Sequence, residues 1–154
     1  MKVYIENEAG SFIKHIYNEK TFELKTSMRV SRAYPFPYGF VPHTSAEDGD
    51  NVDCFVLTKT PLRTGAIVDC HVLGLMEQIE DGEVDHKILA AVPGETVCLD
   101  HRMQQALTDF ALHVFDHLAG KSMRIGRFLD RRAAFVHPRQ HGRGSAQVRR
   151  GSAR

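Results

Sequence analysis

Short apolar runs, interrupted by proline or glycine, dominate the first two thirds of this 154-residue chain. Five runs predict strands, at residues 3–6, 21–25, 52–58, 66–75 and 87–92. Turn-forming residues separate them, including Pro35, Pro37, Gly39, Gly49, Pro61, Gly65, Gly82, Pro93 and Gly94. Several short strands at this spacing favour a small barrel or a sandwich.

One segment has a helical rather than a strand period. In residues 100–118, apolar side chains recur three or four positions apart, at Met103, Ala106, Leu107, Phe110, Val114 and Leu118. Asp100 suits the N-cap position and Gly120 suits a C-terminal stop. We therefore expect one amphipathic helix packed on the barrel, followed by a last strand at residues 122–129.

Composition excludes several classes of protein. No apolar run approaches the roughly 20 residues that span a bilayer, and the first residues lack the apolar region of a signal peptide. We therefore expect no membrane partner. The three cysteines (Cys54, Cys70 and Cys98) show no C-x-x-C spacing. We expect them to be reduced and half-buried in strands, which is typical of a cytoplasmic protein.

Charge divides the chain into two parts. Residues 137–154 contain five of the 20 basic residues and no acidic one, which leaves 15 basic and 19 acidic residues in 1–136. We expect residues 1–136 to fold as one domain and residues 137–154 to form a basic, disordered tail. Because the tail lacks aromatic residues that stack on bases, we do not expect a nucleic-acid partner. An acidic body that binds a polyanion needs metal ions.

The densest acidic cluster directly precedes a predicted strand. Asp48, Asp50 and Asp53 lie within six residues, and strand alternation places Asp53 on the same face as Phe55 and Leu57, which we expect to point inward. Carboxylates this close repel one another unless they are fully solvated or neutralised by cations. A solvated loop is the simpler interpretation of such a cluster.

An EF-hand is a second alternative, and only the second acidic turn described below favours another kind of metal site over a solvated loop. An EF-hand does not fit, because Asp53 occupies its glycine position and Lys59 its final glutamate position. A second acidic turn, residues 80–85, precedes Lys87. Two carboxylate-rich turns with lysines suit magnesium that bridges phosphates, since the metal neutralises charge, acidifies a water and holds the leaving group. The lysines bind the remaining phosphate charge.

These residues belong to a longer set of motifs. The set comprises YPFPYGFVPHT at 34–44, DGDNVD at 48–53, Pro61-Leu62, Gly65, Val68, DHKI at 85–88 and Val92-Pro93. Over residues 4–128 the chain resembles the soluble family I inorganic pyrophosphatases. The resemblance implies a mainly β fold, a five-stranded OB-like barrel with a flanking helix, and a homo-oligomer. It also implies magnesium-dependent hydrolysis of inorganic pyrophosphate.

The resemblance assigns roles position by position. The implied general base is Asp50, acting on a nucleophilic water between two metals. The implied metal set is Asp48, Asp50, Asp53, Asp85, Glu80, Asp81 and Glu6. The implied phosphate-binding residues are Lys14, Tyr38 and Lys87, with Tyr34 in support. Without the resemblance, Tyr34 would be equally well explained as a core packing residue, and Lys14 as a surface lysine.

Several positions depart from the family pattern. Where the family has Lys-x-Glu, this chain has Lys14-His15-Ile16, and the family's phosphate-binding arginine aligns near Thr26, with Lys25 or Arg29 nearby. Asn51 replaces the usual Pro or Glu of the aspartate motif.

A phosphate-binding Tyr-Lys pair of the family aligns with Val114 and Phe115, which could line a cleft or belong to the core. Each lost charge-assisted contact is worth roughly 1.5–3 kcal/mol. Two alternatives follow: hydrolysis of another small phosphoanhydride, or a degenerate binding or scaffold module. The retained aspartates argue against a scaffold. His113 and His117 are one helical turn apart, but without a third ligand we expect exposed histidines rather than a zinc site.

Overall fold

The computed structural model describes residues 1–44 and 49–132. Asp48 and the predicted tail at 137–154 lie outside the described residues. The elements in chain order are β1 (Lys2–Asn7), β2 (Ile13–Asn18), β3 (Glu23–Arg29), β4 (Tyr38–Val41), β5 (Val52–Val56), β6 (Ile67–Asp69), β7 (His71–Glu80), β8 (Glu83–Val84), β9 (Lys87–Ala91), α1 (His101–His113) and β10 (Met123–Asp130).

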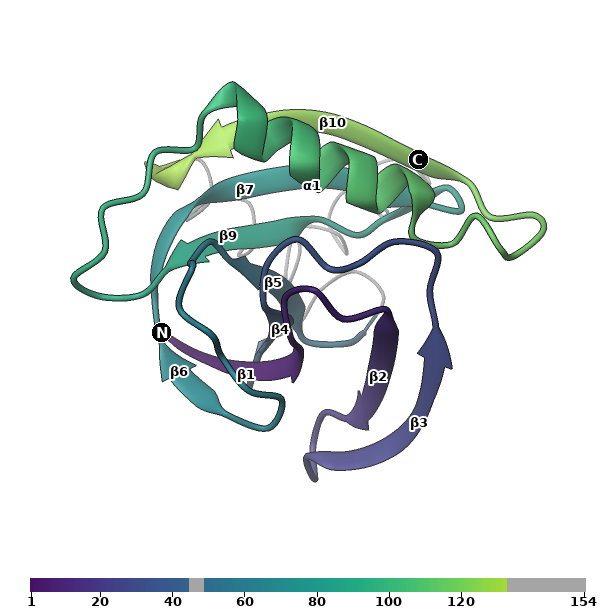
Figure 1. Ribbon diagram of the computed structural model, residues 1–154, viewed down its shortest axis with the longest axis horizontal. Coiled ribbons are helices and arrows are strands. Elements are labelled where there is room, and N and C mark those ends of the chain that lie inside the picture. Colours follow the sequence, from purple (N-terminus) through teal and green to yellow (C-terminus); the bar gives the residue numbers. More distant parts are fainter. Residues whose placement is uncertain (45–48, 133–154) are drawn as a thin grey trace, which may run out of the picture.

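The main sheet curls around a central core. Its strand order is β10-β7-β9-β5-β4-β1-β6, with β8 paired to β7, and β5 and β9 are parallel neighbours while the other pairs are antiparallel. The predicted strand at 66–75 is in fact two strands, β6 and β7, which meet at Cys70. At this corner the chain passes from β6, at one end of the sheet, back to β7 near the other end, so that the sheet curls around the core (Figure 1). This agrees with the expected OB-like barrel.

Apolar residues cover both faces of the sheet. The barrel interior contains Val3, Ile5, Val41, Val52, Cys54, Val56, Cys70, Leu75, Ile88 and Ala90. A second cluster lies between the outer face and α1, and includes Val30, Tyr34, Tyr38, Phe55, Leu57, Met76, Leu89, Leu107, Phe110, Ala111 and Val114. Asp53 shares the face of Phe55 and Leu57, as alternation predicts. That face of β5 packs against α1 and does not point into the barrel interior, so the expected inward orientation was wrong. The opposite face of β5 points into the barrel, and both faces are therefore buried.

The helix begins where the sequence predicts and ends earlier. The Asp100 carboxylate accepts a hydrogen bond from the backbone N–H of Met103 at 2.9 Å, an N-cap of the usual kind. The helix ends at His113 rather than 118, and turns lead to Gly120, whose φ is +80°. Leu118 is exposed, so burial does not extend the helix that far.

The predicted exposed histidines do not share a helix face. His113 Nδ1 lies 2.9 Å from Asp116, and His117 Nδ1 lies 2.8 Å from the Ser31 hydroxyl. Each ring therefore has its own local partner. Among the described residues no group of metal-binding side chains includes either histidine.

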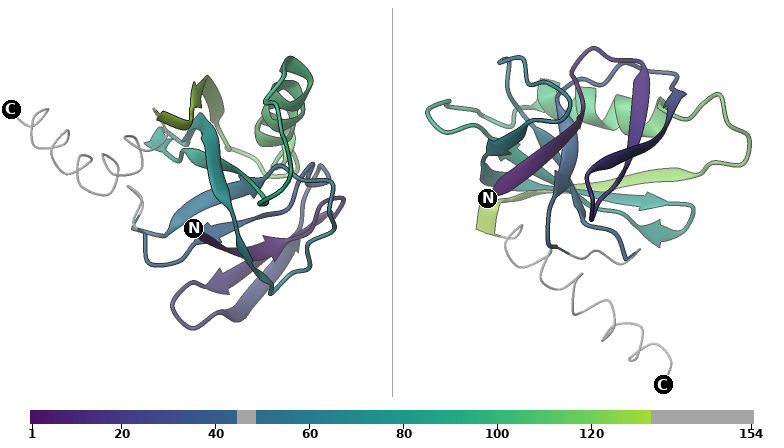
Figure 2. Two further views of the ribbon diagram at one scale, coloured as in Figure 1. Left: turned by 90° about the vertical axis from the view of Figure 1, so that its left-hand side faces the viewer. Right: turned by 90° about the horizontal axis from the view of Figure 1, so that it is seen from below.

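Two strands of a separate hairpin, β2 and β3, stand at the end of the molecule away from α1 (Figures 1 and 2). The strand predicted at 21–25 overlaps β3 only at 23–25, and neither β2 nor β4 was predicted. The hairpin is attached to the barrel through aromatic packing. Phe22 lies 4.9 Å from Tyr4 and stacks on Phe40 at 6.0 Å between ring centroids.

The three cysteines are free, as expected. Their positions agree only in part with the expectation that all three are half-buried in strands. Cys54 is buried in β5 and Cys70 is buried at the β6–β7 corner, whereas Cys98 is exposed in the loop before α1. None of the helices in the described ranges has the length and apolar character needed to traverse a membrane.

Gly39 tests the packing of the barrel. A Cβ atom at this position would overlap the carbonyl oxygen of Tyr4 on the neighbouring strand, so an alanine requires β1 and β4 to separate. We expect Gly39→Ala to lower the free energy of unfolding in urea by about 2 kcal/mol or more. Gly126→Ala is the matched control, because its Cβ would meet only the side chain of Glu77, at 3.1 Å. Equal losses for the two variants would contradict the prediction.

Candidate functional site

The pairing of β5 with β9 creates the centre of the site. The two strands are parallel, with Asp53 opposite Lys87. The Lys87 ammonium donates hydrogen bonds to Asp53 at 2.6 Å, to Asp85 at 2.9 Å and to the Tyr38 hydroxyl at 2.9 Å. Lys87 is only 5% exposed. One buried cation is thereby shared by two carboxylates, one from β5 and one from the residues just before β9.

The charges of this group are strongly coupled. Burial alone would lower the pKa of Lys87, but Asp53 and Asp85 outweigh it and raise that pKa above its ordinary value. Burial raises the pKa of Asp85, and the charge of Asp53 adds to the rise against the opposing effect of Lys87. Burial also raises the pKa of the Tyr38 hydroxyl well above its usual range. The lysine therefore stays protonated, and the site retains an excess of carboxylates.

Glu6 contributes a carboxylate from the opposite side. The register between β1 and β4 shifts between Ile5 and Asn7, so Glu6 occupies a bulge, a feature that re-aims a side chain. Glu6 is 6% exposed, and burial followed by the charge of Asp53 raises its pKa to about 8. A cation near this carboxyl would favour its charged form and so oppose the rise in pKa.

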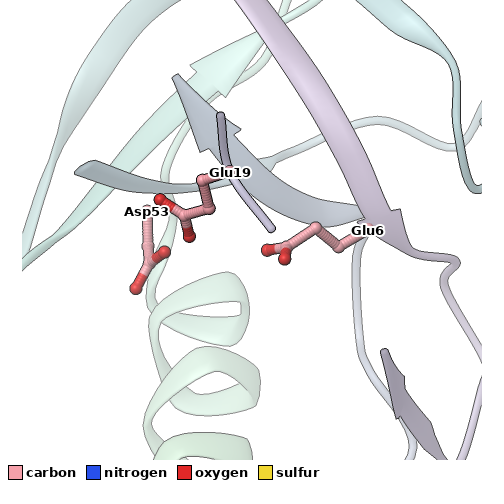
Figure 3. A group of neighbouring side chains, drawn as sticks. All are labelled: Glu6, Glu19 and Asp53. Atoms are coloured by element: carbon pink, nitrogen blue, oxygen red, sulfur yellow. The ribbon is translucent and has the colours of Figure 1, made fainter. Parts of the chain in front are cut away.

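One carboxylate was absent from the residues assigned by resemblance. Glu19 follows β2, and the carboxylates of Glu6, Glu19 and Asp53 each offer an oxygen within 4.8 Å of the others (Figure 3). The local sequence around Glu19 resembles an ordinary polar turn. Only the docking of the hairpin on the barrel brings it to Asp53, so no signal along the sequence could have found it.

Two adjoining pockets contain most of the predicted site residues. The first, of about 240 Å³, is lined by Lys14, Tyr34, Tyr38, Asp50, Asp53, Glu80, Asp85 and Lys87, among others. The second, of about 610 Å³, shares Lys14, Tyr38, Asp50 and Asp53 and adds Glu6, Glu19, Lys20 and Lys25. The two pockets form one cleft, to which α1 and the strands β1, β2, β3, β4, β5, β7, β9 and β10 contribute. We call it the carboxylate cleft.

Asp81 does not reach the carboxylate cleft. It adopts a positive φ of 52° at the tip of the second acidic turn and lines a separate surface pocket with Glu80 and Asp85. Lys121 lies 2.8 Å from Glu80 and 3.3 Å from Asp81, with its ammonium 5.1 Å from the centre of the Phe115 ring. The second acidic turn therefore has its own neutralising lysine.

The departures from the family pattern have clear structural positions. Ile16 and Thr26, which align with the missing glutamate and arginine, are cross-strand partners in the β2–β3 hairpin. Lys25 lines the cleft, whereas the Arg29 guanidinium lies over the Phe12 ring at 5.4 Å. Of these two candidate substitutes for the missing arginine, only Lys25 faces the site.

Val114 and Phe115 both line the first pocket. Val114 is the C-cap of α1 and is 4% exposed, so it is a core residue that also forms the cleft wall. Phe115 packs against the same cluster. Both interpretations of this pair are therefore correct: the two residues line the cleft and also belong to the core.

Comparisons with known proteins agree on one family. A family model described as inorganic pyrophosphatase matches residues 3–123. An inorganic pyrophosphatase of Halalkalibacterium halodurans is 32% identical, over 87% of this chain and 88% of that protein. One from a Nostoc species is 35% identical, over 77% of this chain and 70% of that protein. The crystal structure of inorganic pyrophosphatase from Thermus thermophilus superposes with a TM-score of 0.81 at 29% identity, covering 92% of this chain and 88% of that one.

Removing the shared ammonium should destabilise the fold. Lys87→Met keeps most of the side-chain volume but leaves Asp53 and Asp85 facing each other without a cation. We expect a loss of about 3–5 kcal/mol in the free energy of unfolding, measured without divalent metal. Lys2→Met is the matched control, because its ion pair with Asp69 is exposed on both sides and is worth at most about 1 kcal/mol. A loss for Lys87→Met no larger than the control would show that the buried pair does not hold the site together.

Proposed function

The chain belongs to the inorganic pyrophosphatase family, and from this premise we propose that it hydrolyses inorganic pyrophosphate to two phosphates. One observation carries the proposal: carboxylates and lysines from separate strands and turns line a single cleft. An acidic cleft binds a polyanion only together with cations, because like charges repel strongly where water is partly excluded. A bound divalent cation balances the carboxylates of the cleft, and the phosphate oxygens of a substrate then bind the cation and the lysines.

We propose magnesium as that cation. Carboxylate oxygens are the ligands that magnesium prefers, and Asp53 and Asp85 share one ammonium, so negative charge remains to be balanced. The proposed ligands are Asp53 and Asp85, with Asp48 by resemblance. Glu6 and Glu80 complete the acidic lining of the cleft, and Asp81 lies outside it. Magnesium bound there would neutralise phosphate charge and lower the pKa of a water molecule.

Asp50 is the proposed general base. Its place at the wall common to both pockets supports this role. The oxygen of a water molecule attacks one phosphorus atom of pyrophosphate while a proton passes from the water to the Asp50 carboxylate. The bond between that phosphorus and the bridging oxygen breaks, and the bridging oxygen leaves with the second phosphate. A base positioned this way contributes on the order of 10²–10⁴-fold to the rate.

Lys14, Tyr38 and Lys87 are the proposed phosphate-binding residues. The Lys14 ammonium lies 5.5 Å from the centre of the Tyr38 ring, and the Tyr38 hydroxyl accepts the hydrogen bond from Lys87. Tyr34 is the proposed support: it is buried, and its ring packs against Tyr38 and Phe110. Lys25 extends the positive side of the cleft.

A different small phosphoanhydride is the second candidate substrate. The observation that favours it is the apolar wall formed by Val114 and Phe115 where the family has a phosphate-binding pair. Comparing the rate of phosphate release from pyrophosphate with that from a panel of nucleotides decides between the two substrates. A scaffold role without catalysis would require buried, mutually repelling carboxylates to be kept without a function.

A cytoplasmic location and a homo-oligomer complete the proposal. Three free cysteines among the described residues support the first. The exposed apolar side chains of Leu24 and Ile67, at the edges of their sheets, are compatible with the second. The division into a domain at 1–136 and a tail at 137–154 stays a prediction.

Magnesium should stabilise the folded protein. A ligand that binds only the folded state raises the free energy of unfolding by about 2.7 kcal/mol when its concentration is 100 times its dissociation constant. We expect millimolar MgCl₂ to raise Tm and EDTA to reverse the rise. Sodium chloride at equal ionic strength is the control for simple screening of the acidic cleft. An identical Tm in the two salts would contradict a magnesium site.

Asp50→Asn tests the proposed base. The substitution removes the proton acceptor at nearly constant shape, so we expect kcat for pyrophosphate to fall by roughly 10²–10⁴-fold with Tm almost unchanged. Asp109→Asn on the exposed face of α1 serves as the control and should retain full turnover. If Asp50→Asn also keeps full turnover, another group accepts the proton.

A further inference from the structure

The turn that joins β2 to β3 delivers a carboxylate to the cleft in a fixed position. The Asn18 side chain accepts hydrogen bonds from the backbone N–H groups of Lys20 and Thr21, at 3.0 and 3.1 Å, and so shapes the turn around Glu19. Phe22 at the end of the turn packs on Tyr4. Glu19 is therefore held between an internally bonded turn and an aromatic anchor on the barrel.

A backbone donor from the aspartate motif orients Glu19. The N–H of Asn51 donates to Glu19 Oε1 at 2.8 Å. Asn51 is fixed in turn, since its side-chain oxygen accepts from the N–H of Thr44 at 3.1 Å. The family usually has Pro or Glu at this position, and a proline could not provide this hydrogen bond because it lacks an N–H.

Glu6 supplies an independent sign that a cation belongs here. Glu6 is 6% exposed, it points toward Glu19 (Figure 3), and no hydrogen bond to its side chain is found within residues 1–44 and 49–132. A largely buried carboxylate without a hydrogen-bond donor is costly in its charged form unless a cation balances that charge.

The spacing of the three carboxylates fits one ion. Each offers an oxygen within 4.8 Å of the others. Two oxygens on opposite sides of one magnesium ion lie about 4.2 Å apart, given metal–oxygen distances near 2.1 Å. Small side-chain rotations therefore suffice to bring all three to a shared ion.

We propose that Glu19 is a metal-binding residue of the carboxylate cleft, acting with Glu6 and Asp53 and held by the Asn51 N–H. It supplies from the hairpin turn the carboxylate that is missing at Ile16, whose side chain cannot bind a cation. Two departures from the family pattern, Ile16 and Asn51, are thereby linked: one removes a carboxylate and the other provides the donor that positions its replacement. The inference rests on the proposed metal-dependent function.

Glu19→Gln tests the proposal in the absence of substrate. The amide keeps an oxygen for the Asn51 N–H but loses the charge, so we expect the affinity for magnesium, titrated calorimetrically on the intact chain, to fall about 10-fold or more. Glu23→Gln, on the same hairpin but exposed, is the matched control and should bind magnesium as the unmodified chain does.

A second pair of variants tests the hydrogen bond from the Asn51 N–H to Glu19 separately. This pair also keeps the proposal testable if Glu19→Gln does not fold. Asn51→Pro removes the N–H donor, and Asn51→Ala keeps it. We expect Asn51→Pro to bind magnesium more weakly than Asn51→Ala, and the loss to vanish in the Glu19→Gln background, since both changes act through the Glu19 carboxylate. Equal affinities of Glu19→Gln and the unmodified chain would overturn the inference while leaving pyrophosphate hydrolysis intact. A chain that hydrolyses no pyrophosphate with magnesium would instead overturn the proposed function.

Discussion

A single buried ammonium, that of Lys87, lies between the carboxylates of Asp53 and Asp85, and the geometry of the cleft depends on it. Removing a charge from water costs several kcal/mol, which only close and well-bonded partners offset. Here the parallel pairing of β5 with β9 provides this closeness through the backbone. The tyrosine hydroxyl of β4 satisfies a further donor of the ammonium. The pairing of β5 with β9 therefore fixes both the topology of the sheet and the positions of these charges.

The cleft shows how a site can keep its charge pattern while its motif changes. The hairpin has an isoleucine and a threonine opposite each other where the family has charged residues, yet its turn contributes Glu19 and its second strand Lys25. Lys121, from the loop after α1, lies over the ring of Phe115 but pairs with the second acidic turn. In the hairpin, the fold rather than the sequence order decides which side chains reach the cleft.

Features with a local pattern could be predicted from the sequence, and features created by tertiary contacts could not. The N-cap at Asp100 and the strand after Asp53 follow from neighbouring residues. The end of α1 was predicted too late, since Leu118 continues the helical spacing without being buried. The strand β4 lies among prolines and glycines that obscure its pattern. Asp50 and Asp85 belong to recognisable motifs, whereas Glu19 becomes a site residue only when the hairpin docks.

The ring of strands has a consequence for how the chain reaches this structure. Tyr4 pairs with Ile67, and Asp53 pairs with Lys87 across a connection that contains β6, β7 and β8. Pairing distant segments costs loop-closure entropy before any contact compensates for it, and such topologies fold slowly. The same slow step must bring several carboxylates together. Because like charges repel, we expect ions that screen or bind these carboxylates to ease this step of folding as well as to stabilise its product.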